Sequence, residues 1–325
     1  MAFTGPLTAG MSSDDCAARK CAWSPSGAFV AGSFDDATVR TWYAATGAEG
    51  PRFDAPDEDE ELMNIMVTRD DSRVIVLSET QFHVWCMEKD HVTSMSLMEP
   101  ASDEVQYTCG DYARMCPAHC EAIPNLAETV ALGRSDGKVE FVHFDAGVSC
   151  FLDVPTHDCT DYNVVCVRFS PDGTRLAAVV TDERSHVFVF LWDIGTLEIT
   201  HSFPVFGICN MAWSPDSRKL AIARDDSVDV FDLQVQPTPS PTVVESKYTC
   251  ETLSAHSSFC AWSQDALLLV YQAGDRIDVR DAKTYEITKT IRVNGATDAC
   301  LSPDSRSIVY AARNGCLTIE SLVQG

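Results

Sequence analysis

The residues best suited to binding a metal lie in one short stretch. Cys116, His119 and Cys120 fall within five positions, and Cys109 lies seven residues before Cys116. Thiolate and imidazole groups are the donors that zinc prefers in a tetrahedral set. The stretch has no second matched pair of ligands, and motifs this short arise by chance in a chain with 14 cysteines. We therefore expect no metal and no other cofactor, with these four residues as the only candidates.

Motifs of catalysis are missing from the sequence. It has no Gly-x-Ser-x-Gly elbow, no His-Glu-x-x-His, no P-loop and no Gly-x-Gly-x-x-Gly. Carboxylates are abundant, but none is paired in a way that goes beyond surface charge. We expect a protein that is not an enzyme, and a site assembled from loops is the enzymatic alternative.

The elements of the chain are short strands. Residues 165–203 contain four apolar, β-branched runs separated by turns rich in Pro, Gly and Asp, which is typical of hairpins. The first turn of this unit, Ser170–Gly173, belongs to a Ser-Pro-Asp type that recurs from Ser24 to Ser302 about every 46 residues. A four-stranded repeat of this length predicts the blades of a propeller.

A second repeated feature is the third strand of each unit, an apolar run that in several units ends in an aromatic residue or Asp. Seven such third strands are found: 38–42, 82–86, 138–145, 187–193, 228–232, 277–281 and 316–321. With the Ser-Pro-Asp turns, and second strands such as FVAGS at 29–33, the chain resembles the WD-repeat family of β-propellers over nearly its whole length. Trp192-Asp193 spells the dipeptide that gives the family its name.

The resemblance implies an all-β fold, a single seven-bladed propeller of four-stranded antiparallel blades. The expected blades cover residues 18–53, 64–98, 111–154, 164–203, 209–253, 258–292 and 298–325. The last unit has only three strands, so we expect residues 2–9 to supply its fourth strand and close the ring. Closure removes the exposed sheet edges of an open array, and Pro6 suits an outermost strand because it has no N–H to pair.

The family's buried Asp–His–Ser/Thr–Trp network is incomplete here. No blade carries the Gly-His dipeptide, while Asp36 and Trp42 preserve part of the network in blade one. We expect Asp36, Trp42, Trp192 and Asp193 to be structural, and the stability to come from apolar packing between blades.

Four arginines are binding candidates. Arg134, Arg224 and Arg313 each end a second strand, and Arg184 lies in the corresponding turn of blade four. Family topology puts these turns on the top face near the central channel, where guanidinium groups would bind a carboxylate or phosphate. The interpretation we favour is that each arginine pairs with a local acid such as Asp136.

Insertions supply further candidates. The acidic run Asp57, Glu58, Asp59, Glu60 and Glu61 lies in the connection 54–61, which family topology puts on the top face with the connection 99–112. The run suits a basic peptide, although most such runs are solvated loops. The Pro-rich segment 237–241 is expected on the opposite face.

Composition sets the class of partner. The 325-residue chain has 24 basic and 48 acidic residues and a net charge of −24, which disfavours nucleic acid and favours basic partners. No apolar run is long enough for a membrane helix. The start of the chain lacks the features of a signal peptide, which indicates a cytoplasmic or nuclear protein.

We expect a scaffold that binds protein partners through basic segments or through short acidic or phosphorylated motifs. The scaffold would be a monomer or a subunit of a larger complex. The alternative is a propeller that binds a small ligand or acidic peptide at an arginine-lined channel mouth.

Overall fold

The fold was analysed in a computed structural model of the full chain. The structure describes residues 4–7, 16–55, 61–89, 91–96, 105–113, 129–143, 148–154, 162–205, 207, 210–223, 228–233, 243–244, 259–293 and 295–322. The predicted 237–241 segment lies outside these ranges.

The described strands form seven antiparallel sheets of four strands each, which confirms the predicted fold class. Blade one holds β2 (Ala18–Trp23), β3 (Phe29–Phe34), β4 (Thr38–Tyr43) and β5 (Glu49–Asp54). Blade two holds β6 (Leu62–Val67), β7 (Arg73–Ser78), β8 (Gln81–Cys86) and β9 (His91–Ser96). Blade three holds β10 (Tyr107–Tyr112), β11 (Thr129–Arg134), β12 (Lys138–His143) and β13 (Val148–Asp153).

The other four blades repeat the pattern. Blade four holds β14 (Tyr162–Phe169), β15 (Arg175–Asp182), β16 (Val187–Asp193) and β17 (Ile199–Val205). Blade five holds β18 (Asn210–Trp213), β19 (Lys219–Ala223), β20 (Val228–Asp232) and β21 (Val243–Val244). Blade six holds β22 (Cys260–Trp262), β23 (Leu268–Ala273), β24 (Arg276–Asp281) and β25 (Ile287–Arg292). Blade seven holds β26 (Ala296–Leu301), β27 (Ser307–Ala312), β28 (Leu317–Ser321) and β1 (Gly5–Leu7). Strand β10 begins before residue 111, where the sequence suggests that blade three starts.

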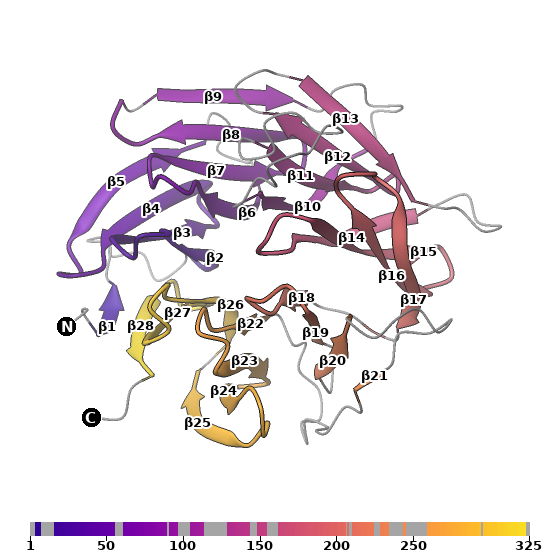
Figure 1. Ribbon diagram of the computed structural model, residues 1–325. Helices are drawn as coiled ribbons and strands as arrows, with labels where there is room; N and C mark the ends of the chain where they lie inside the picture. Colours follow the sequence, from indigo (N-terminus) through magenta and orange to yellow (C-terminus); the bar gives the residue numbers. More distant parts are fainter. Residues whose placement is uncertain are drawn as a thin grey trace.

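The blades stand around a common centre with their first strands innermost (Figure 1). Each first strand contacts the first strand of the next blade, from β2 through β6, β10, β14, β18 and β22 to β26, and β26 contacts β2. The ring is therefore closed. One of its faces carries the turns between first and second strands. We call this the bottom face, and the opposite one, which carries the turns between second and third strands, the top face.

The last blade is completed by the N-terminal segment, as the sequence predicts. Strand β1 pairs antiparallel with β28, and Gly5, Pro6 and Leu7 lie opposite Ile319, Thr318 and Leu317. Strand β1 is the outermost strand of this sheet. Pro6 is tolerated there because an edge strand does not need every N–H for the ladder.

The hydrophobic core lies between the blades. At the seam of blades seven and one, Trp42 and Val30 pack with Val309 and Leu317. Packing there is close, because a Cβ at Gly32 would lie only 2.8 Å from the side chain of Leu317. Burying such side chains stabilises the fold by about 1.5–3 kcal/mol each. Side-chain packing between blades therefore joins sheets that share no backbone ladder.

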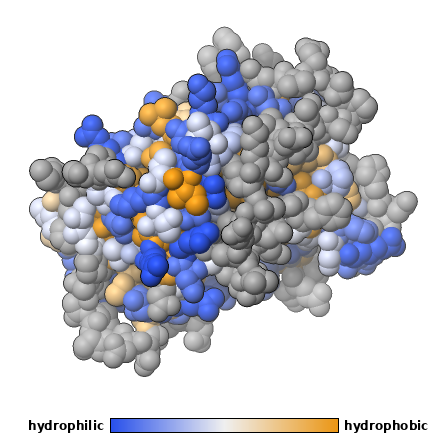
Figure 2. Space-filling view, turned by 90° about the horizontal axis from the view of Figure 1, so that it is seen from below, coloured by the Kyte–Doolittle hydropathy of each residue, from blue (hydrophilic) through white to orange (hydrophobic). Residues whose placement is uncertain are grey.

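The rim of the ring is mainly hydrophilic where Figure 2 shows it, with small, separate hydrophobic areas. The exposed large hydrophobic residues of the described chain are Tyr43, Phe151, Leu267 and Ile287. No helix long and apolar enough to cross a membrane occurs among the described residues.

Candidate interaction faces

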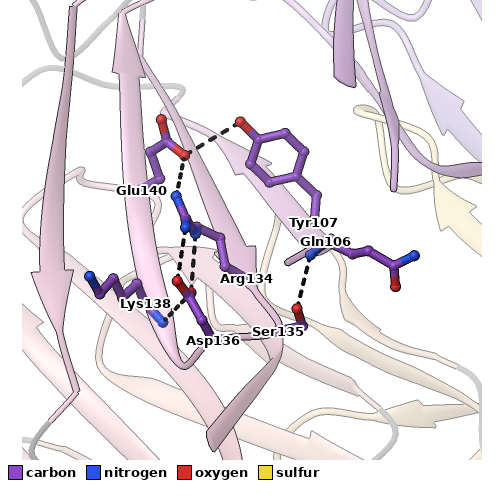
Figure 3. Close-up of polar contacts among 7 residues, drawn as sticks. All are labelled: Gln106, Tyr107, Arg134, Ser135, Asp136, Lys138 and Glu140. Carbon is purple, nitrogen blue, oxygen red and sulfur yellow. Dashed lines mark hydrogen bonds and ion pairs between the residues drawn. The ribbon is translucent and has the colours of Figure 1, made fainter. Parts of the chain in front are cut away.

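Arg134 lies inside blade three, where two carboxylates hold it (Figure 3). Its side chain is 2% exposed. Nε and Nη2 donate to the two oxygens of Asp136 at 3.1 and 2.8 Å, and Nη1 donates to Glu140 Oε2 at 3.4 Å. The hydroxyl of Tyr107 donates to the same Glu140 oxygen at 3.4 Å. Burial, and then the negative charge of Glu140, raise the pKa of Tyr107, so the phenol stays protonated.

The turn that carries Arg134 is fixed by its neighbours. Gly137 has a φ of +79°, and a Cβ there would lie 2.7 Å from Tyr162 of the next blade. The hydroxyl of Ser135 accepts the N–H of Gln106 at 2.9 Å (Figure 3). Arg134 therefore follows the interpretation in which the arginine pairs with local acids. Its guanidinium is not presented at the channel mouth.

Blade one uses the same three positions differently. Asp36 lies in the turn equivalent to that of Asp136, and Arg40 takes the strand position of Glu140. Arg40 forms an ion pair with Asp36, and its guanidinium carbon lies 4.4 Å from the centre of the Phe34 ring. The arginine thus lies on the second strand in blade three and on the third strand in blade one. In both blades it forms an ion pair with the aspartate of the turn. Asp36 also accepts the Thr38 hydroxyl at 2.6 Å.

The two tryptophans predicted to be structural are buried. Trp42 and Trp192 are each 1% exposed. The indole N–H of Trp42 has no hydrogen-bond partner among the described residues. Asp193 caps the turn after its strand by accepting the N–H of Thr196 at 3.0 Å. In blade one, Asp36 forms its side-chain bonds with Arg40 and Thr38, and it does not accept the indole N–H of Trp42.

Two of the predicted binding arginines are exposed on the top face. Arg184 lies in the turn between β15 and β16, and Arg313 in the turn between β27 and β28. Neither guanidinium has an ion-pair partner in the part of the chain that the structure describes. Their backbones are held, because Asp182 Oδ1 accepts the N–H of Arg184 and the Gly295 carbonyl accepts that of Arg313. Arg224 lies outside the described residues.

The acidic and metal candidates are only partly described. Glu61 is exposed and lies 3.8 Å from Arg19 Nη1, whereas Asp57, Glu58, Asp59 and Glu60 lie outside the described ranges. Cys109 is buried, and burial raises the pKa of its thiol to about 12. Cys116, His119 and Cys120 also lie outside the described ranges. No group of three metal-ligand side chains is found within those ranges.

On the bottom face, the Ser-Pro-Asp turns share one hydrogen-bond pattern. Ser170 donates to Asp172 Oδ1 at 2.7 Å and accepts the N–H of Arg175 at 2.9 Å, while Asp172 accepts the N–H of Thr174 at 3.0 Å. The same three bonds form in the turns that begin at Thr68, Ser214, Ser263 and Ser302. In blade one, Ser26 takes the place of the aspartate. Side-chain oxygens thus satisfy backbone donors that a tight turn leaves unpaired.

The fourth residue of each of these turns has a left-handed backbone, and in three blades it also links two blades. Asp71, Ser217 and Ser305 have φ values of 60°, 58° and 60°. Their side chains accept backbone N–H groups of the preceding blade: Ser26 at 3.2 Å, Asp172 at 3.1 Å and Gln264 at 2.9 Å. The link offsets the cost of a non-glycine residue in this conformation.

Comparison with known proteins agrees with the resemblance to the WD-repeat family. The model for the WD domain, G-beta repeat, matches residues 9–43 and 148–187, two segments that include strands of blades one, three and four. These matches support a protein of the WD-repeat family. The WD repeat-containing protein 1 of Mus musculus is 32% identical over 117 residues, which is 34% of this chain and 18% of that protein. The protein of the same name from Xenopus tropicalis is 27% identical over 157 residues, 45% of this chain and 24% of that protein.

The chain thus matches less than a quarter of the length of each of these relatives. WD-repeat propellers typically serve as scaffolds that bind other proteins, and they are generally non-catalytic. The match supports this general role. It names no partner.

A third set of polar residues lies on the innermost strands, and no sequence pattern singles these residues out. Asp298 Oδ2 accepts the N–H of Cys21 at 3.1 Å, and Asp111 Oδ2 accepts that of Phe169 at 2.7 Å. These N–H groups belong to strand edges that face the centre of the ring. Arg168 Nη2 donates to Asn210 Oδ1 at 3.1 Å across the next seam. Burial raises the pKa of Asp298.

The side chains of this set form hydrogen bonds with backbone groups at the inner edges of the sheets. Each innermost strand pairs on one side only, so its other edge leaves backbone groups without ladder partners. Side chains of the neighbouring blade supply those partners, as Asn64 does for the Gly110 carbonyl at 2.7 Å. Only the pairing of blades, and not the sequence pattern, identifies such residues.

Proposed function

We propose that this WD-repeat propeller is a non-catalytic scaffold that binds other proteins through its top face. The observation that carries the proposal is the exposure of Arg184 and Arg313 on that face. Both follow rigid, ladder-bonded strands, and neither guanidinium is taken up by an ion pair within the described residues. Rigid elements that present uncommitted polar groups are suited to recognition.

Charge supports two classes of partner segment. Free guanidinium groups bind carboxylate or phosphate in bidentate fashion, which suits short acidic or phosphorylated motifs. The net charge of −24 attracts basic segments over the rest of the surface. We propose cytoplasmic or nuclear proteins as the partners, with no direct contact to nucleic acid and no insertion into a membrane. The propeller acts as a monomer or as one subunit of a complex.

The state of the cysteines supports a non-catalytic role. Burial raises the pKa of the Cys21 thiol well above its usual value, and it also raises that of Cys109. A thiol of this kind is a poor nucleophile at neutral pH. The carboxylates of the bottom-face turns are engaged in backbone hydrogen bonds. Neither group supports an acid–base or nucleophilic site.

Charge reversal on each face tests the proposal. We expect the double variant Arg184→Glu/Arg313→Glu to lose captured protein partners in pull-downs from lysate, with an unchanged melting curve. The matched control is Arg218→Glu/Arg306→Glu, because both residues are exposed in bottom-face turns and the change in charge is the same. We expect the control to retain the partners, and high salt to weaken their capture. Loss of partners only in the control variant would reject the top face as the binding face.

A further inference from the structure

The outermost strand of blade six differs from other outermost strands of the ring. Strand β25 lies at the rim, and no described strand pairs with its outer edge (Figure 1). It has six residues and no proline, whereas β1, β5 and β17 contain Pro6, Pro51 and Pro204. Proline is one of the residues that keep an edge strand from pairing with another chain. Every residue of β25 therefore keeps its backbone N–H.

The backbone groups of β25 that point outward follow from the ladder. The N–H of Val293 donates to the carbonyl of Asp275 at 2.9 Å, just beyond the end of β25. Opposed residues in an antiparallel ladder alternate between pairs that exchange such bonds and pairs that do not. Arg292 and Thr290 lie one and three positions before Val293 in this register. Their N–H and C=O groups therefore point away from β24 and toward the open edge.

At one end of β25, two arginines lie side by side with only one of them paired. Arg292 lies directly opposite Arg276, and like charges in this arrangement repel each other. The Nε of Arg276 lies 3.3 Å from Asp278 Oδ1. Arg292 is exposed and has no ion-pair partner among the described residues. A carboxylate on a neighbouring strand would relieve this repulsion.

The same face of β25 carries an exposed apolar side chain. Ile287 is 47% exposed and lies opposite Arg280. Arg276, Asp278 and Arg280 alternate along β24, so the residues opposite them on β25 share one face. Strands β9 and β13 also lack proline, but the described part of β9 has no exposed large apolar residue, and β13 has no basic residue. An open edge, a basic residue and an apolar side chain thus occur together on β25.

We propose that an extended acidic segment of a protein partner adds to β25 as a fifth strand of blade six. The outward backbone groups of Thr290 and Arg292 form ladder hydrogen bonds with the segment, a carboxylate pairs with Arg292, and an apolar side chain covers Ile287. This inference rests on the proposed role as a protein scaffold. It adds a site at the rim of the ring, apart from the top-face turns.

A second copy of this chain is the other source of a strand for this edge. Residues 276–292 contain five basic and three acidic residues, although the whole chain has a net charge of −24. Pairing β25 with the β25 of a second copy would bring two basic edges together, which is unfavourable. An acidic segment brings opposite charges together, and it is therefore the occupant that the edge favours.

The test uses the peptide acetyl-Glu-Val-Thr-Val-Thr-Val-amide, which has the length of β25 and places its glutamate opposite Arg292 in an antiparallel strand. NMR follows the amide resonances of isotope-labelled threonine in the protein. We expect shifts at Thr288 and Thr290, which Thr288→Val and Thr290→Val assign by their loss. Hydrogen exchange of the Thr290 N–H should slow about tenfold at saturation. A peptide with glutamine for glutamate should bind about two- to fivefold more weakly, as expected for one exposed ion pair.

The deciding variant is Thr290→Pro, which removes an outward N–H from β25. Thr290→Val is the matched control, because both variants lose the hydroxyl that donates to Asp278 Oδ1 at 3.0 Å, and only proline lacks the N–H. We expect Thr290→Pro to weaken binding about tenfold or more, measured at the Thr288 resonance, and Thr290→Val to bind normally. Arg292→Glu should reverse the preference, so that a peptide with lysine for glutamate binds better.

An unmoved Thr290 resonance, a shift without slower exchange, or equal binding by the two Thr290 variants would overturn the proposal. Equal affinity for the glutamate and glutamine peptides would reject an acidic occupant. A doubled mass in solution that Thr290→Pro abolishes would show that a second copy fills the edge instead. If Thr290→Pro does not fold, the exchange measurement decides. None of these outcomes bears on the top face, because the charge-reversal pull-downs measure that binding separately.

Discussion

The two faces of the ring are built on different plans. On the bottom face, turns of one kind recur from blade to blade, and three of them bind the turn of the blade before. On the top face the turns differ between blades: an arginine–aspartate pair is found in blades one and three, and an exposed arginine in blades four and seven. The bottom-face turns are therefore alike in most blades, whereas the top-face turns vary from blade to blade.

The largest expected effect concerns the buried charge cluster of blade three, which Figure 3 shows. We expect Arg134→Ala to lower the free energy of unfolding by about 3–5 kcal/mol, because it leaves Glu140 buried without its cation. Urea denaturation measures this. The control Arg184→Ala, in an exposed top-face turn, should change stability by less than about 0.5 kcal/mol. The double variant Arg134→Met/Glu140→Met should recover most of the loss. Equal effects of the two single variants would break the distinction between buried and exposed turns.

A smaller effect tests whether the bottom-face links join blades. Ser217→Ala removes the acceptor for the N–H of Asp172 and should cost about 0.5–1.5 kcal/mol. The converse variant is Ala266→Ser, because Ala266 holds the linking position in blade six with a φ of 56°. We expect it to add stability, up to about 1 kcal/mol, through a new bond to the turn of blade five. If both variants have the same sign, the links do not contribute as described.

The smallest effect is a dependence on acid. A hydrogen bond from Ser72 lowers the pKa of Asp70, and one from Ser302 lowers that of Asp304. A carboxyl group whose folded pKa is depressed stabilises the fold above its unfolded pKa of about 3.9, and this stability is lost as the pH falls through the folded pKa. We therefore expect the urea midpoint to fall below about pH 4. Asp70→Asn should flatten this fall, and an unchanged slope would contradict the role of the turn carboxylates.

The fold was predictable from the sequence because its signals are local. A Ser or Thr with Asp two residues later marks five of the tight turns, and the apolar runs on either side are the strands. The pairing of Arg134 with Asp136 was also predictable, since the two residues lie in one turn. The contacts of Glu140 and Tyr107 were not, because they come from other strands whose register the sequence does not show.

The pairing of β1 with β28 has a consequence for how the chain is made. Residues 7 and 317 face each other in one sheet although they are about 310 positions apart. A ribosome releases the first partner long before it makes the second, so blade seven is the last sheet that can be finished. Bringing two such distant ends together in an otherwise unfolded chain costs about 5 kcal/mol of loop entropy. Assembly of the six other blades reduces that cost by carrying the ends toward each other. Until they meet, β28 has one edge open to any other strand in the cell.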